Sequence, residues 1–63
     1  MMDRETRLAV ETAVAARDAA RLARHNILML HDAPVDMRRA VKPLSDAADR
    51  LDRYITHEIS VNA

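Results

Sequence analysis

The most regular hydrophobic pattern of the chain runs from residue 37 to residue 55. Apolar residues recur there at alternating spacings of four and three: Met37, Val41, Leu44, Ala48, Leu51 and Ile55. This alternation keeps one side of an α-helix facing a partner helix. We therefore predict that the segment is helical and packs along its length against another helix.

A second helix is predicted from about residue 4 to about residue 30, and two adjacent stripes of mostly small or apolar residues line it. One stripe is rich in alanine: Ala9, Ala13, Ala16, Ala20, Ala23, Ile27 and Leu30. The other includes two polar residues: Leu8, Thr12, Ala15, Ala19, Leu22, Asn26 and Met29. Asp3 can cap the start of the helix, and Glu5 lies favourably in its first turn. Because small side chains let helices approach closely, we predict that the alanine-rich stripe lies inside a tight antiparallel helix pair.

Residues 31–33 interrupt the helical pattern and form the predicted loop. Pro34 suits the first turn of a following helix, where its missing N–H has no helical partner to lose, and Asp32 can cap that turn. A link this short joins helices of similar length as antiparallel neighbours. The predicted fold class is therefore all-α, with residues 1–63 forming a single helical hairpin whose second helix runs from about residue 34 to about residue 60.

Pro43 lies inside this second helix, where it removes a backbone hydrogen bond and disfavours helical angles at Lys42. The segment can form one helix kinked at Pro43, or a short helix over 35–41 followed by a second that begins near Pro43. The apolar positions keep their spacing across the proline, from Val41 to Leu44. This continuity favours the kinked helix.

The first helix carries more apolar surface than one neighbouring helix can cover. Its two stripes span an arc of roughly 200°, whereas a helix with one packed face has an apolar arc little wider than about 100°. A chain of 63 residues buries only a small core, and without cysteine it has no disulfide to compensate. We therefore predict a homodimer in which two hairpins form a four-helix bundle. The predicted dimer interface contains Leu8, Ala15, Ala19, Leu22, Asn26 and Met29, with the Asn26 amide fixing the register.

The composition argues against several classes of function. Ten basic and ten acidic residues cancel, so net charge provides no general attraction to nucleic acid or anionic lipid. Glycine is absent and Tyr54 is the one aromatic residue, which excludes glycine-rich phosphate loops and disfavours stacking on bases. The histidines His25, His31 and His57 show no zinc-ligand spacing, and no hydroxyl lies in a nucleophile motif. We expect no enzymatic activity, no metal, no cofactor and no small-molecule substrate.

The sequence also bears on location. No apolar run approaches the roughly 20 residues of a membrane span, and the first residues lack the apolar core of a signal peptide. The absence of cysteine fits a reducing compartment. We therefore expect a soluble, cytoplasmic protein.

One face of the first helix is a candidate partner-binding surface. Arg17, Arg21 and Arg24 follow one another at spacings of four and three, so that like charges lie side by side. Val10 and Val14 precede them on the same side. Guanidinium groups bind carboxylates and phosphates through paired hydrogen bonds, and an apolar pair beside them is typical of a small protein-binding patch. The alternative interpretation is an exposed ridge whose charge is offset by acids of the other helix or of a second subunit.

The charges of the second helix predict local ion pairs instead. Asp46 precedes Arg50 by four residues, and Asp49 precedes Arg53 by four. Each such pair stabilises a helix by about 0.2–0.5 kcal/mol. We interpret this face as a solvated surface.

Three functions fit such a dimer. The first is a noncatalytic interaction protein that regulates or inhibits another protein through the arginine face, of a size that suits a phage- or plasmid-encoded inhibitor of a host factor. The second is RNA binding, because in length and two-helix plan the chain resembles the Rop family of plasmid copy-number regulators, whose hairpins dimerise and bind paired RNA loops. This resemblance covers architecture alone and carries over no site residue. The third is a structural subunit of a larger helical assembly.

Overall fold

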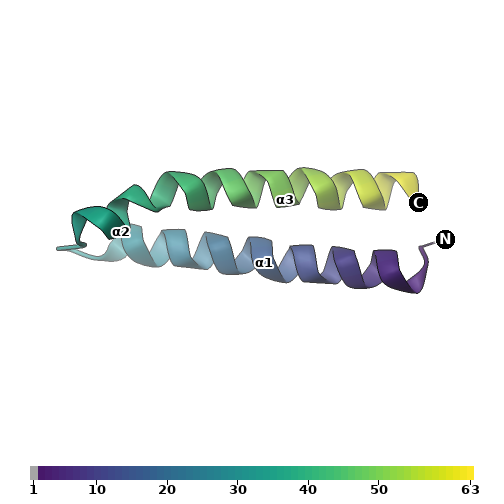
Figure 1. Cartoon of the computed structure of the whole chain (residues 1–63), viewed down its shortest axis with the longest axis horizontal. Coiled ribbons are helices and arrows are strands. Elements are labelled where there is room, and N and C mark those ends of the chain that lie inside the picture. The colour runs from purple at the N-terminus through teal and green to yellow at the C-terminus, as the bar shows by residue number, and fades with distance from the viewer. Residues whose placement is uncertain (1) are drawn as a thin grey trace.

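The computed structural model describes residues 2–63, which form three α-helices: α1 (Arg4–Met29), α2 (Val35–Arg39) and α3 (Val41–Val61). The helices α1 and α3 lie antiparallel and side by side, while α2 and the loop close one end of the molecule (Figure 1). The structure is elongated, with extents of 47 × 15 × 15 Å. The predicted all-α architecture of two packed helices is confirmed.

The first helix, α1, is capped by the residue before it. The Asp3 carboxylate accepts a hydrogen bond from the Thr6 backbone N–H at 2.7 Å, and this bond lowers the pKa of Asp3. The cap satisfies one of the N–H groups that a first helical turn leaves without a partner. At the other end, the Leu30 N–H donates to the Ile27 carbonyl oxygen at 3.2 Å and so closes the last turn.

The second helical segment is divided, which differs from the single kinked helix favoured by the sequence. Its short part α2 ends at Arg39, α3 begins at Val41, and Ala40 lies between them with φ −74° and ψ −15°. The Ala40 N–H donates to the Met37 carbonyl oxygen at 3.1 Å, a tighter turn than that of an α-helix. The break precedes Pro43 and thereby places the proline in the first turn of α3, where a backbone N–H has no helical partner.

The contact between α1 and α3 buries mainly small side chains. The buried residues are Ala13, Ala33, Ala48 and Ile55, and among residues 2–63 no side chain is completely buried. The apolar positions predicted along α3 do face α1, because Ala48 and Ile55 are buried and Val41, Leu44 and Leu51 are half-buried. Met37 lies outside α3, on α2, and is exposed. The core is therefore narrow and rich in alanine.

The first helix is rotated relative to the predicted orientation. Its alanine-rich stripe divides, with Ala13 buried and Ala20, Ala23 and Ile27 half-buried, but Ala9, Ala16 and Leu30 exposed. Half-buried residues on the other side of Ala13 are Val10, Val14 and Arg17. The two valines and the aliphatic stem of Arg17 offer α3 more apolar surface than alanine does. This contact explains why the inward side of α1 is not centred on the alanines.

The hairpin leaves a large surface exposed for its size. Its accessible surface is 4983 Å², whereas a compact chain of this mass exposes about 4,100 Å². Its radius of gyration is 14.4 Å, against about 10.6 Å for a compact domain of equal length. Large apolar side chains of α1 contribute to this surface, since Leu8 is 50% exposed, Leu22 60% and Met29 72%. None of the helices within residues 2–63 combines the length and hydropathy needed to cross a membrane.

The first prediction concerns the narrow core. Ile55 is 4% exposed and Ile59, one turn later on the same helix, is 54% exposed. The substitution Ile55→Ala should lower the free energy of unfolding by about 2–3 kcal/mol, because it opens a cavity between α1 and α3. The matched control Ile59→Ala should cost less than about 1 kcal/mol. Urea denaturation followed by circular dichroism measures both, and equal losses would contradict the packing described.

Candidate functional site

An ion-pair cluster joins the two long helices along one side of the hairpin. Arg17 on α1 donates from Nη1 to Asp52 Oδ1 on α3 at 2.8 Å, and from Nε to Asp18 Oδ1 at 3.1 Å. Arg21 Nη2 lies 3.8 Å from the same Asp52 oxygen. The hydrogen bond to Asp52, and then that to Asp18, raise the pKa of Arg17. The cluster ties the middles of α1 and α3 together, and we call this side of the hairpin the charged side.

The five residues predicted as the partner-binding surface do not form one exposed face. Val10, Val14 and Arg17 are half-buried, and the Arg17 side chain is 21% exposed. The Arg21 side chain is 51% exposed. Arg24 is also exposed, and among residues 2–63 no carboxylate lies within 4.0 Å of its guanidinium group. The alternative interpretation, in which acids of the other helix balance the charge of the arginines, therefore holds for Arg17 and, in part, for Arg21. Exposed guanidinium groups remain at Arg21 and Arg24.

A shallow pocket of the charged side lies beside these two arginines. Arg21 and Arg24 from α1 line it together with Ser45, Ala48 and Asp49 from α3. Guanidinium, hydroxyl and carboxylate groups thus meet at one place, where they can form hydrogen bonds with a polar partner surface. The sequence pattern identified the arginines, but their neighbours come from α3 and follow only from the way the helices pack.

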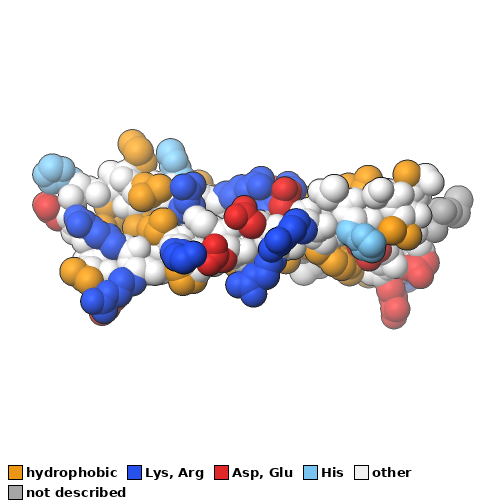
Figure 2. Space-filling model, turned by 90° about the horizontal axis from the view of Figure 1, so that it is seen from above, with side chains coloured by type: hydrophobic (Ala, Val, Ile, Leu, Met, Phe, Trp, Pro, Cys, Tyr) orange, Lys and Arg blue, Asp and Glu red, His pale blue; other side chains and the backbone are white. Residues whose placement is uncertain are grey.

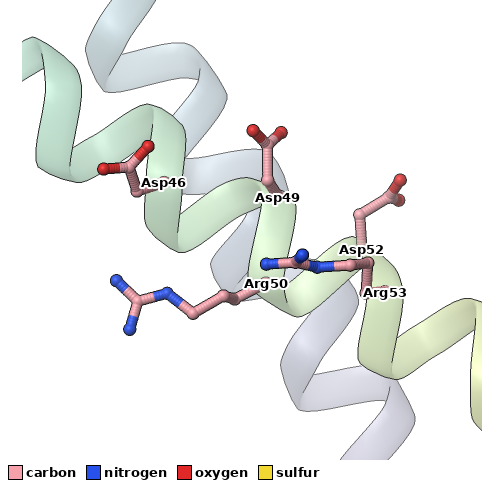
Figure 3. A pocket seen from close by; sticks show the side chains of 5 residues that line it. All are labelled: Asp46, Asp49, Arg50, Asp52 and Arg53. Carbon is pink, nitrogen blue, oxygen red and sulfur yellow. The ribbon is translucent and has the colours of Figure 1, made fainter.

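The exposed surface of α3 carries alternating charges. The side chains of Asp46, Asp49 and Asp52 point to one side of the helix, while Arg50 and Arg53 extend back along it (Figure 3). The predicted pairs of Asp46 with Arg50 and of Asp49 with Arg53 are not formed within 4.0 Å in the described chain; Asp46 Oδ2 instead lies 3.3 Å from Lys42 Nζ. Solvent competes strongly for exposed charges, so such pairs contribute little to stability.

This alternation limits what the outer surface of α3 can bind. Seen from the α3 side, Lys and Arg alternate with Asp and Glu over the middle of the molecule (Figure 2). Phosphate backbones favour clustered positive charge. The alternation of charge on this surface provides no such cluster. Within residues 2–63, no three His, Cys, Asp or Glu side chains are placed to hold a metal ion.

The opposite side of the hairpin is apolar. A shallow groove between the helices is lined by Leu8, Ala9, Thr12, Ala13, Ala16, Leu51 and Tyr54. Ala16 and Arg21 on α1 are five residues apart, as are Tyr54 and Asp49 on α3, which separates each pair by about 140° around its helix. The groove therefore faces away from the charged side, and we call its face the apolar side.

Of the six residues predicted as the dimer interface, Leu8 lines this groove and the other five do not. All six are exposed: Leu8, Ala15, Ala19, Leu22, Asn26 and Met29. The exposure of Leu22 and Met29 in a single hairpin agrees with the expectation from the arc of α1. Sequence reasoning missed the contribution of Leu51 and Tyr54 to the groove, because it assigned Leu51 to the contact with the first helix and assigned Tyr54 to no surface. The available signal was that Tyr54 follows Leu51 by three residues, a spacing that places two residues on the same side of a helix.

The two sides of the hairpin differ in chemistry. Comparison of the chain with protein-family models, with curated proteins and with solved structures gave no match. The charged side presents hydrogen-bonding groups at Arg21, Arg24 and Asp49, and the apolar side presents a carbon-lined groove. Function is therefore inferred from these surfaces.

The second prediction concerns the ion-pair cluster. Asp52→Asn replaces the carboxylate that accepts a hydrogen bond from Arg17 and attracts Arg21 with a neutral amide. The urea midpoint should therefore fall by roughly 0.2–0.5 M. The control Asp36→Asn should lower the midpoint less, because the Asp36 side chain is 98% exposed and its 3.9 Å pair with Arg39 lies within one short helix. The difference between the urea midpoints of the two variants should become smaller in 1 M NaCl, where charges are screened. Equal midpoints for the two variants at low salt would contradict a stabilising role for Asp52.

Proposed function

We propose that this protein is a noncatalytic interaction module that acts as a homodimer and binds another protein. Two hairpins pack through their apolar sides into a four-helix bundle, and the charged sides face outward. The observation that carries this proposal is the exposed apolar groove between α1 and α3, with Leu8 and Tyr54 at its edges.

The amount of exposed surface supports the dimer. The hairpin exposes about 900 Å² more than a compact chain of its mass, and a partner in a stable protein complex contributes about 800 Å² to the interface. Packing two grooves together covers Leu8, Leu51 and Tyr54, which the hairpin alone leaves partly exposed. The gain compensates for a core built mainly of alanine, because burial of large apolar side chains is the dominant stabilising contribution.

The charged side supports the second part of the proposal. Arg21 and Arg24 lie away from the apolar groove, so their guanidinium groups stay accessible to solvent when two hairpins dimerise. Guanidinium groups form paired hydrogen bonds with carboxylates, which suits a partner protein with acidic residues on its surface. Binding there makes the dimer a small regulator or inhibitor of that partner, rather than a catalyst.

The third prediction tests the dimer. Light scattering at micromolar concentration should give twice the mass of one chain. Ala16→Glu places a charge in the apolar groove and should raise the dimer dissociation constant at least about tenfold, because each buried carboxylate lacks a partner. Thr56→Glu is the matched control, exposed on α3 and outside the groove, and should leave the mass unchanged.

Two outcomes would contradict the dimer. One is a wild-type chain that is helical and monomeric at micromolar concentration, which would favour the structural-subunit alternative, in which a different protein covers the apolar side. The other is an Ala16→Glu variant with the same mass and dissociation constant as the wild type.

The fourth prediction tests the partner surface. In affinity capture from a cell extract, Arg21→Glu combined with Arg24→Glu should reduce the recovered partner at least about tenfold, because both guanidinium groups become carboxylates. Arg4→Glu combined with Arg7→Glu is the matched control, since these arginines have the same spacing and are also exposed. Identical capture by the two double variants would contradict the proposed surface. A captured partner that ribonuclease removes would favour the RNA-binding alternative.

A further inference from the structure

An apolar pocket lies close to the loop end of the hairpin. It is lined by Ile27 and Leu28 of α1, by Leu30 just after the end of α1, and by Arg38 of α2 and Val41 of α3. Leu28 is 57% exposed although it lines a depression in the surface. Hydrophobic side chains lie beside Lys and Arg at this end of the molecule (Figure 2). The pocket thus combines exposed apolar surface with nearby positive charge.

This pocket adjoins the polar pocket of Arg21 and Arg24. On α1, Leu28 follows Arg24 by four residues, and on α3 Ser45 follows Val41 by four. Residues four apart on a helix lie on the same side, with Cβ atoms about 6 Å apart. Both helices therefore place the two pockets one helical turn apart along the charged side.

Positive charge predominates across the two pockets. Three guanidinium groups and one carboxylate line them: Arg21, Arg24, Arg38 and Asp49. Neither Arg24 nor Arg38 has a carboxylate within 4.0 Å in the described part of the chain, whereas the neighbouring Arg39 lies 3.9 Å from Asp36. These two guanidinium groups are available to a ligand that brings its own carboxylates.

We propose that these adjoining pockets bind an acidic amphipathic helix of the partner protein. Carboxylates of that helix pair with Arg21, Arg24 and Arg38, and an apolar side chain one turn away enters the pocket beside Leu28. The spacing of the pockets matches the spacing of residues i and i+4 on the incoming helix. The inference rests on the proposed function and identifies the class of partner that the charged side recognises.

The probe for this proposal is a synthetic helical peptide of Glu, Ala and Leu, with its leucines on one face. Fluorescence anisotropy should show saturable binding in the micromolar range, and amide chemical shifts should change mainly over residues 21–28 and 38–45. A peptide with Gln in place of Leu should bind at least about tenfold more weakly, because the apolar pocket then stays empty.

Matched variants separate the pocket from a general attraction of charge. Leu28→Gln and Arg24→Gln should each weaken peptide binding at least about fivefold. Ile59→Gln and Arg7→Gln alter an apolar and a basic residue that are also exposed but lie toward the other end of the hairpin. These two controls should bind like the wild type.

Three results would overturn the inference. They are the absence of saturable binding up to millimolar peptide, equal effects of the variants and their controls, and a preference for vesicles of anionic phospholipid over the peptide. The proposed function can be distinguished from it by capture from a cell extract. A partner that is lost with the Arg21→Glu, Arg24→Glu variant but kept with Leu28→Gln supports the proposed function and contradicts the acidic-helix inference.

Discussion

The close packing of α1 against α3 through alanine is the constraint on which the rest of the structure depends. Ala13 and Ala48 are buried at this contact, and Ile55 is the one large side chain among the buried residues of the described chain. Small side chains let two helices approach closely, but each contributes little buried apolar area. The hairpin consequently keeps large apolar side chains on its surface, among them Leu8, Leu22 and Met29.

The orientation of α1 then separates the surface into two sides. Val10 and Val14 turn partly toward α3, and Arg17 reaches Asp52 at 2.8 Å. Arg21 and Arg24 consequently lie beside Ser45 and Asp49 on the charged side. Ala9 and Ala16 lie on the other side, beside Leu51 and Tyr54. One rotation of a helix thus determines both the apolar groove and the arginine surface, and places them on different sides of the hairpin.

Those parts of the fold that depend on local hydrogen bonding and periodicity could be predicted. The Asp3 cap is local, because its carboxylate bonds to the Thr6 N–H within the same turn. The apolar residues of α3 recur at alternating spacings of three and four, which leaves one side of that helix as the inward side. The position of the break at Ala40 could not be read in the same way. Pro43 disfavours a continuous helix, but the break can be placed at any of several preceding residues, and the packing of α2 against both long helices selects one.

By itself, the sequence determined that the chain forms helices, that they pair as a hairpin, and that α3 uses the side of Ala48 and Ile55. It also indicated that α1 has more apolar surface than one neighbour covers. Only the tertiary structure decided which side of α1 faces inward. An alanine-rich helix presents similar small side chains around much of its circumference, so its pattern specifies no single inward side. The inward side is decided by contacts between residues far apart in the chain, namely those of the half-buried valines with α3 and the Arg17–Asp52 pair. The two pockets beside Arg24 and Leu28 result from these contacts.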